Sequence, residues 1–476
     1  IGPFFFTCCG CLLHMKSRGK LFDRSPLRSL HANPSSPLCK IPIGAMDALN
    51  GESSDSNGCV SCTTFNILAP IYKRLNTGIR ESEFKESWLC RNEGILDRLL
   101  HLNSSLICLQ EFWLCNEELL SIYDAQLGDA GYVTYKLART NNRGDGLLTA
   151  VHLNHFRVLN YKELLFNDIG DRVAQLLHLE LSSHFSQNQS SGIQKEVLVV
   201  NTHLIFPHDY RYCFLRLQQV YKILQYIHDY SKENKVLLAP VVLCGDWNGS
   251  KKGHVYKFLR SQGFVSCYDL AHQYTDNNDS LQKWISHRNH RGNTCGVDFI
   301  WLRNPKKEQK PLEKCYLEAT WGNFMHLVEN WSGGSNLRNI FNENSFISYP
   351  LFYKTLNEMG IHGHAYENGL CDEDIKNLWE YLDADKTGLI DVDNVSKSWN
   401  PDSLFDQHCS NDEEDGDDAC VVQKLNENKP SATVGFTVKR AMLFPPEVEE
   451  GMWPDNYSLS DHAHLTVEFL TKMQPA

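Results

Sequence analysis

Polar residues that suit metal-assisted phosphodiester cleavage stand at the ends of six hydrophobic segments. The segments are TTFNIL (63–68), LICLQEF (106–112), VLVVNTHL (197–204), VVLCGDWN (241–248), GVDFIWL (296–302) and LSDHAHLTVEF (459–469). Each apolar run predicts a buried strand, so its polar residue is expected where the strand reaches the sheet edge. Several strand ends can hold side chains around one ion. These side chains are Asn66, Glu111, His203, Asp246, Asn248, Asp298, Asp461 and His462.

The segments between these runs predict the elements that must position them. Helical stretches are expected at 87–102, 116–127 and 209–230, where the last repeats apolar residues near every 3.6 positions. From 133 to 181 the sequence predicts consecutive strands without helices between them, which indicates antiparallel ribbons. Two packed sheets with helices outside would satisfy both patterns. The expected fold class is therefore α/β.

In their order along the chain, the six segments resemble the endonuclease/exonuclease/phosphatase superfamily. This superfamily includes pancreatic deoxyribonuclease, apurinic-site endonucleases and neutral sphingomyelinases. FNILAP, followed by Ile71 and Tyr72, and LICLQE are similar to the deadenylase branch with the carbon catabolite repressor type, nocturnin and Angel. The resemblance covers residues 60–302 and 433–470. It implies a four-layer α/β/β/α sandwich and a 3′ exoribonuclease that depends on Mg²⁺ or Mn²⁺.

The chemistry expected of these residues starts from the negative charge of a phosphodiester, which repels nucleophiles and which a magnesium ion offsets. Glu111 is the expected first metal ligand. The resemblance implies a metal or phosphate contact for Asn66. Asp461 is expected to serve a second metal ion and His203 to contact a phosphate. One of Asp246 and Asn248 would orient or deprotonate the attacking water while the other donates to a phosphoryl oxygen. His462, held by Asp298, would stabilise the phosphorus centre or protonate the leaving oxygen.

Each residue taken alone has a structural alternative. An aspartate after a strand is usually a cap or turn residue, Asn66 could form an Asx-turn, and His203 could be a core histidine. Asp145 and His152 flank another segment with a family counterpart, GDGLLTAVH, but are weaker candidates for direct chemistry. The sequence contains no G-x-S-x-G, H-E-x-x-H or paired C-x-x-C motif, which argues against hydrolysis by a serine, a cysteine or a zinc ion. The functional interpretation depends on the residues occurring together.

An insertion separates the last two segments, since Asp461 follows Asp298 by 163 positions. The expected organisation is a disordered segment at 1–58, a catalytic domain at 59–303, an insertion at 304–432 with an acidic linker, and closing strands at 433–472. The basic, serine-containing stretch 15–40 is typical of an organelle transit peptide or of an unstructured basic tail.

The insertion contains DADKTGLIDVDN (383–394), which matches an EF-hand calcium loop with Gly388 at position 6 and Ile390 at position 8. A degenerate partner loop is expected from Ile340, with Ile347 at its position 8. Asn394 replaces the usual bidentate glutamate, so Ca²⁺ binding should be weak; an acidic helix-capping turn is the alternative. With this insertion the chain resembles plant calcium-binding members of the superfamily. The expected ligands are Asp383, Asp385, Thr387, Leu389, Asp391 and Asn394.

Composition favours a globular protein that does not bind nucleic acid through general basicity. The formal net charge is −12, so a nuclease would need metal ions and a local basic groove, although the acidic run 412–418 carries part of the surplus. The 17 cysteines have no regular spacing, which predicts a reducing compartment: cytoplasm, nucleus or an organelle. Cys59 and Cys62 form a C-x-x-C with no second pair nearby, which gives too few ligands for structural zinc. No membrane span is expected.

A basic cluster with an adjacent aromatic residue precedes GVDFIWL and suits single-stranded RNA. A solvated surface loop is the structural alternative. Two other function classes stay open: a phosphatase or phospholipase acting on a nucleotide or a phospholipid head group, and a calcium-responsive module that binds a protein partner through the EF-hand lobe. The residues expected to contact substrate are Trp284, His287, Arg288 and Arg291.

Overall fold

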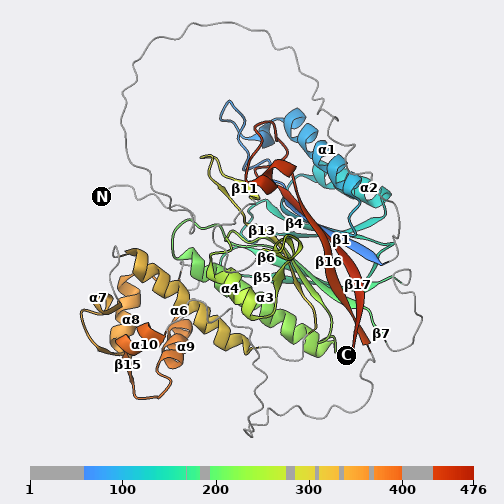
Figure 1. Cartoon of the computed structure of the whole chain (residues 1–476). Coiled ribbons are helices and arrows are strands. Elements are labelled where there is room, and N and C mark those ends of the chain that lie inside the picture. Colours follow the sequence, from blue (N-terminus) through green and yellow to red (C-terminus); the bar gives the residue numbers. More distant parts are fainter. Residues whose placement is uncertain are drawn as a thin grey trace, which may run out of the picture.

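Two β-sheets packed face to face form the centre of the computed structural model, and helices cover both outer faces (Figure 1). This confirms the predicted four-layer α/β/β/α sandwich. Three predicted features fall outside the described residues: the amino-terminal segment up to residue 57, Trp284 and the acidic run 412–418. The structure describes residues 58–167, 169–182, 193–274, 285–305, 310–331, 337–363, 369–398 and 432–475.

The first sheet has seven strands in the order β3-β4-β2-β1-β17-β16-β7. The carboxyl-terminal strands pair beside β1, so residues far apart in sequence share one sheet. The strands are β1 (Cys59–Asn66), β2 (Leu106–Trp113), β3 (Tyr132–Ala138), β4 (Asp145–His152), β7 (Ile193–Gln194), β16 (Ala432–Phe444) and β17 (His464–Pro475).

The second sheet has six strands in the order β10-β13-β9-β8-β6-β5. Its central strands are almost entirely buried, as expected for strands covered on both faces. The strands are β5 (Phe156–Leu165), β6 (Val173–Leu181), β8 (Glu196–His203), β9 (Val241–Asp246), β10 (Val265–Ser266) and β13 (Asp298–Arg303). A separate ribbon joins β11 (His287–Arg288) to β12 (Thr294–Cys295).

Helices α1 (Lys85–Leu102) and α2 (Glu117–Asp129) bury apolar faces against the first sheet, and α3 (Tyr212–Glu233) and α4 (His254–Ser261) do so against the second. Each fully buried leucine or phenylalanine contributes about 1.5–3 kcal/mol. The Asn116 side chain caps α2 by accepting the Leu119 N–H at 2.9 Å. The short helix α5 (Cys267–Ala271) contacts β13 and β16.

Polar contacts between the sheets fix their relative position just below the expected site. The Gln110 amide donates to Asn201 Oδ1 at 2.8 Å, and the Thr149 hydroxyl donates to Gln175 Oε1 at 2.7 Å. All four residues are fully buried, so breaking either contact would leave an unsatisfied polar group. Gln110 directly precedes Glu111, and Asn201 lies two residues before His203. The contact between Gln110 and Asn201 therefore links the backbone near Glu111 to the backbone near His203.

In the sequence, helices α6 to α10 come after β13 and before β16. In Figure 1 they form the lobe coloured gold to orange. Its long helix α6 packs against α3 and α4, and the Gln218 amide of α3 donates to Asp374 of α9 at 2.6 Å. No helix in the described part of the chain is long and apolar enough to cross a membrane. The lobe contains α6 (Leu312–Trp331), α7 (Leu337–Ile340), β14 (Phe346–Ser348), α8 (Tyr349–Glu358), α9 (Asp372–Leu382), β15 (Leu389–Asp391) and α10 (Val392–Ser398).

Candidate active site

The predicted site residues converge where strands of both sheets end. In the second sheet, His203 at the end of β8 pairs with Asp246 at the end of β9, which pairs with Asp298 at the start of β13. In the first sheet, β1 ends at Asn66, and His462 comes two residues before β17. Parallel and antiparallel pairing thus bring segments separated by nearly 400 positions to one edge.

Asp246 is the centre of this cluster. It is 1% exposed, and its carboxylate accepts the Asn66 amide at 3.0 Å and the Asn248 backbone N–H at 2.9 Å. The preceding Gly245 is required, because a Cβ there would lie 1.8 Å from the Thr202 carbonyl oxygen. The glycine therefore allows β8 and β9 to approach closely enough for His203 Nε2 to lie 3.3 Å from the Asp246 carboxylate.

His462 is held as a cation between two carboxylates. Its Nδ1 lies 2.9 Å from Asp298 Oδ2, and its Nε2 lies 3.7 Å from Asp246 Oδ2. Burial lowers the pKa of His462, but the two carboxylates outweigh burial and raise this pKa to about 10. Burial also raises the pKa of Asp298. At neutral pH the imidazole of His462 is therefore protonated, with Nε2 directed toward Asp246.

His203, in contrast to His462, is neutral at pH 7. Burial lowers its pKa well below the usual value, and the positive charge of Arg172 lowers it further. The Nε2 atom of His203 lies 3.0 Å from the side-chain amide nitrogen of Asn248. Asn248 has a left-handed backbone φ of 47°. The site therefore holds two histidines of different charge, the neutral His203 and the protonated His462. Such a division suits a site that needs one neutral polar contact and one proton donor.

Glu111 reaches the same edge through an irregularity in β2. The pairing of β2 with β4 shifts register between Gln110 and Phe112, and Glu111 has a left-handed φ of 53°. Such bulges redirect side chains near active sites. Glu111 Oε1 accepts the Asn66 amide at 3.4 Å. Burial, followed by the negative charges of Asp461 and Asp145, raises the pKa of Glu111 to about 7.

Asn66 links the two carboxylates of this edge. Its amide nitrogen donates to both Glu111 and Asp246, while its Oδ1 accepts the Leu68 N–H at 3.1 Å. The Asx-turn considered as a structural alternative is therefore present together with the contacts to the site. Leu68 has a left-handed φ of 50°, which is unusual for a bulky residue and typical of functional sites. Asn66 thus positions Glu111 relative to Asp246.

Asp461 lies beside the ribbon β11–β12. The backbone N–H of Arg288 donates to the backbone carbonyl oxygen of Asp461 at 2.9 Å. The rings of His287 and His462 stack with their centroids 4.3 Å apart. Burial would raise the pKa of Asp461, but His287 and His462 outweigh it and lower this pKa to about 2. Asp461 is therefore a carboxylate throughout the physiological range.

The predicted substrate-binding residues are separated by the structure. His287 belongs to the site through Asp461 and His462, whereas the Arg288 guanidinium extends to the exposed Asp455 at 3.3 Å. Arg291 lies exposed in the turn between β11 and β12. Trp284 lies outside the described residues. Of this set, only His287 is placed against the expected catalytic residues.

Arg172 was missed by the sequence analysis. It precedes β6, is 6% exposed, and its Nε and Nη1 atoms have no hydrogen-bond partner among the described residues. Burial and then Arg139 lower the pKa of Arg172, while the charges of Asp145 and Glu111 oppose this shift. The sequence signal was weak, because GDR forms no known motif and the argument needs the neighbouring strands. A buried guanidinium with unused donors suits an anionic ligand.

A second network that the sequence did not reveal surrounds Asp145. The Tyr72 hydroxyl donates to Asp145 Oδ1 at 2.7 Å, and Arg139 bridges Asp145 at 3.2 Å and Asp171 at 2.7 Å. Asp145 is completely buried, and its charge contributes to the raised pKa of Glu111. Asp145 therefore acts on the site through its charge, while His152 lies at the far end of β4.

The predicted calcium loop is organised around Asp383. This carboxylate is 8% exposed and accepts N–H groups from Thr387 at 3.0 Å and Gly388 at 3.1 Å. The Asp391 carboxylate accepts the Asn394 N–H at 3.1 Å. Asp385, Thr387, Leu389 and Asn394 are exposed.

The upstream loop pairs with the calcium loop. In the ribbon of β14 and β15, Ile347 lies opposite Ile390, and these are the residues predicted at position 8 of the two loops. Gly388 has the left-handed φ of 76° that the turn at position 6 requires.

Comparisons with known proteins place the chain among its relatives. No family model matches it. It is 50% identical over 427 residues to a protein of Arabidopsis thaliana called uncharacterized calcium-binding protein At1g02270, across 88% of this chain and 86% of that protein. It is 22% identical over 324 residues to the CCR4-Not complex 3′-5′-exoribonuclease subunit Ccr4 of Debaryomyces hansenii, across 57% of this chain and 37% of that protein.

Among solved structures, the human nocturnin catalytic domain with bound sulfate aligns with a TM-score of 0.39 and 20% identity, covering 52% of this chain and 82% of that domain. The fold and the exoribonuclease named among these relatives indicate a hydrolase of phosphodiester bonds. The chain belongs to the endonuclease/exonuclease/phosphatase superfamily and, within it, to the family of the calcium-binding protein At1g02270.

Proposed function

We propose that the protein is a Mg²⁺- or Mn²⁺-dependent 3′ exoribonuclease that acts on single-stranded RNA and prefers adenosine. The observation that carries this proposal is the buried cluster in which Asn66, His203, Asn248 and His462 surround Asp246. The 3′-5′-exoribonuclease named among the relatives supports the direction of cleavage. The preference for adenosine depends on the deadenylase-like segments FNILAP and LICLQE.

Glu111 would hold the first metal ion and Asp461 would serve a second one, with Asn66 setting the position of Glu111. The donor set fits, because carboxylate oxygens are the ligands that Mg²⁺ and Mn²⁺ prefer. The raised pKa of Glu111 fits as well, because a divalent cation is stabilising beside partly buried acids that repel one another. When bound, the ion would offset the charge of the phosphodiester and polarise its phosphoryl oxygen.

The remaining residues would orient the water and handle the protons. Asp246 would orient or deprotonate the attacking water, because its position is fixed by the Asn66 amide and the Asn248 N–H. Asn248 and the neutral His203 would contact phosphoryl oxygens. His462, protonated at neutral pH through Asp298, would stabilise the developing negative charge or give its Nε2 proton to the leaving oxygen.

The phosphates of the substrate would also contact basic side chains, both buried and on the surface. Arg172 offers two unused donor atoms at the site, and His287 lies against His462. Arg288 and Arg291 would contact the RNA backbone beyond the scissile bond, with Trp284 as the stacking surface. A local basic surface of this kind would compensate for the net charge of −12.

The insertion would bind Ca²⁺ weakly through Asp383, Asp385, Thr387, Leu389, Asp391 and Asn394. The pairing of Ile347 with Ile390 and the name of the Arabidopsis relative support an EF-hand lobe. Asn394 supplies one neutral oxygen where a glutamate gives two charged ones, so the affinity should be below the range of calcium sensors. Phe346 and Leu389, both about half exposed on the ribbon, support a role of the lobe in binding a protein partner.

The test is hydrolysis by the full-length chain of equal concentrations of oligo(A), oligo(U), oligo(C), single-stranded DNA and sphingomyelin, with and without Mg²⁺ at one salt concentration. We expect oligo(A) to be shortened from its 3′ end fastest, and only with the metal ion. Equal rates on the three RNAs would leave a general ribonuclease. Preferential cleavage of sphingomyelin, or no hydrolysis of any substrate, would contradict the proposal and favour the phospholipase or the calcium-responsive binding module.

A further inference from the structure

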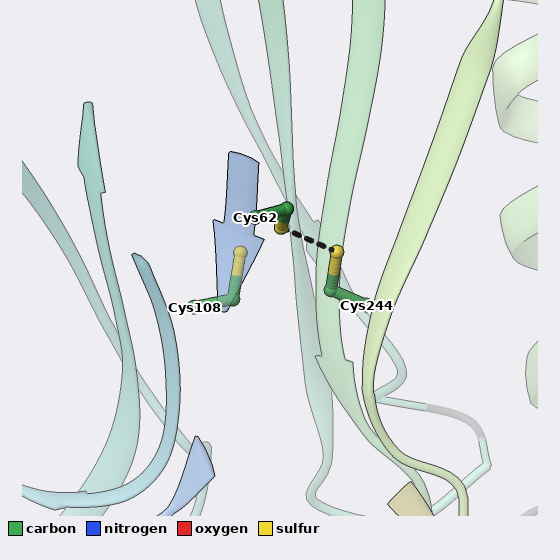
Figure 2. Close-up of side chains that lie close together, drawn as sticks. All are labelled: Cys62, Cys108 and Cys244. Carbon is green, nitrogen blue, oxygen red and sulfur yellow. Dashed lines mark hydrogen bonds between the residues drawn. The ribbon is translucent and has the colours of Figure 1, made fainter. Parts of the chain in front are cut away.

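Three buried thiols converge between the two sheets. Cys62 of β1 and Cys108 of β2 come from the first sheet, and Cys244 of β9 comes from the second (Figure 2). The Sγ atoms of Cys62 and Cys244 lie 3.4 Å apart, and all three sulfurs lie within 4.8 Å of one another. None of the three residues is more than 1% exposed.

This thiol cluster differs from the C-x-x-C motif visible in the sequence. Cys59 and Cys62 are three positions apart on one strand, so their side chains point to opposite faces of the first sheet. Cys62 instead meets residues that are 46 and 182 positions away in the chain. A lone buried cysteine behaves as a small apolar residue, but three sulfurs from three strands that face one another form a possible ligand set.

We propose that Cys62, Cys108 and Cys244 form a binding site for a soft, thiophilic metal ion of the Cu⁺ or Zn²⁺ class. Metal–sulfur bonds of about 2.3 Å place the sulfurs of a three-coordinate site about 4 Å apart, which falls within the observed spacing. Thiolates select soft ions, whereas Mg²⁺ and Mn²⁺ prefer the oxygen ligands of the active site. The two metal sites would therefore differ in the ions they accept.

The protonation of the thiols agrees with this geometry. Hydrogen bonds from Cys244 and Cys62 lower the pKa of Cys108 to about 5 although burial opposes them, whereas the pKa values of Cys62 and Cys244 are raised. Each thiol that becomes a ligand loses its proton to solvent, so three thiolates with Zn²⁺ leave one net negative charge, and with Cu⁺ two. The smaller buried charge favours Zn²⁺, while a three-coordinate shell favours Cu⁺.

The position of the thiol cluster gives it a structural consequence for the active site. Cys62 lies four residues before Asn66, Cys108 three residues before Glu111, and Cys244 two residues before Asp246. The same three strands therefore carry the thiol ligands and the residues expected to hold Mg²⁺ and water. An ion bound to all three sulfurs would join the two sheets directly below the catalytic edge.

The experiment uses the full-length chain expressed in medium supplemented with copper, zinc or cadmium and then dialysed against a chelator. We expect about one soft ion to be retained per chain, with X-ray absorption of the copper- or zinc-loaded protein showing a shell of about three sulfur ligands near 2.3 Å. Cys108→Ala should lose the ion while keeping its circular dichroism spectrum. The matched control, Cys115→Ala, removes an exposed thiol and should retain it.

Three results would overturn the proposal: no retained ion, a shell of nitrogen and oxygen ligands, or an isolated protein in which mass spectrometry finds a Cys62–Cys244 disulfide. A nitrogen and oxygen shell would point to the histidines and aspartates of the active site instead. If Cys108→Ala does not fold, the ligand shell of the unaltered chain still decides the question, because it reports the bound atoms directly.

Discussion

The catalytic edge and the calcium loop both gather acidic side chains, but they do so in different ways. At the edge, Asp246 and Asp298 are fully buried and receive their partners from strands of both sheets. In the loop, twelve consecutive residues supply the expected ligands, and apart from Asp383 most of them face solvent. The edge therefore depends on the whole fold, whereas the loop is organised mainly by its own sequence.

This difference has energetic consequences. A buried carboxylate interacts with its neighbours at low dielectric, which is why the pKa values of Glu111 and His462 are shifted so far. Removing one member leaves the others buried without their partners. An exposed loop acid interacts mainly with water, so its replacement should affect only calcium binding. Substitutions at the edge should accordingly have much larger effects.

The largest effect is expected for Asp246→Ala, which removes the group proposed to orient the attacking water. It should lower kcat by at least about a hundredfold without unfolding the protein. Steady-state hydrolysis of oligo(A), together with thermal unfolding, measures both quantities. The control is Asp97→Ala, which removes an exposed carboxylate from α1 and should leave kcat unchanged. Near-normal turnover in Asp246→Ala would show that the site is assigned incorrectly.

Asp298→Asn should have the next largest effect, because it removes the carboxylate that holds His462 protonated. The pKa of His462 should fall from about 10, so the imidazolium is lost at a lower pH and the alkaline limb of the pH–rate profile moves down. We expect a decrease in kcat of about tenfold to a hundredfold at pH 8. NMR titration of His462 gives an independent readout. An unchanged alkaline limb would exclude His462 as the proton donor.

Arg172→Gln should weaken RNA binding more than it slows the chemical step. Losing one buried phosphate contact should raise KM by about tenfold and reduce the salt dependence of binding by about one phosphate. Arg157→Gln is the matched control, since Arg157 is exposed on β5 and paired with Glu180. If both variants show the same small change in KM, Arg172 has only a structural role.

The smallest effect belongs to the calcium loop. Asn394→Glu restores the bidentate ligand and should tighten Ca²⁺ binding by about tenfold, measured by titration calorimetry on the full-length chain. The same variant should have the normal rate on oligo(A), because the loop and the catalytic edge are separate clusters. Submicromolar binding by the unaltered chain would show that Asn394 is an adequate ligand and that the loop is a calcium sensor.

The strand-end residues could be predicted because each carries its own local signal. VVLCGDWN combines an apolar run with a polar end, and the structure places Asp246 where that pattern indicates. Helix boundaries followed within a few residues: 116–127 was expected for α2, which spans Glu117–Asp129. The pairing of Ile347 with Ile390 followed from loop positions alone.

Arg172, the network around Asp145 and the thiol cluster could not be predicted in the same way. Each depends on which strands become neighbours, and a single sequence contains no direct record of this. The left-handed backbone of Glu111 is a further example, since the bulge that turns its side chain arises from pairing between β2 and β4. Where a cluster of residues is formed by contacts between the two sheets, the local sequence pattern identifies only some of its members.

Metal dependence tests the central claim most directly, because Glu111 and Asp461 have a catalytic role only if they hold an ion. The measurement is the rate of oligo(A) hydrolysis by the full-length chain in excess EDTA and again after Mg²⁺ is restored, with Glu111→Ala treated identically. We predict that EDTA abolishes hydrolysis, that Mg²⁺ restores it in the unaltered chain, and that Glu111→Ala stays at least about a hundredfold slower. Hydrolysis that persists in excess EDTA, or full recovery in Glu111→Ala, would contradict the account.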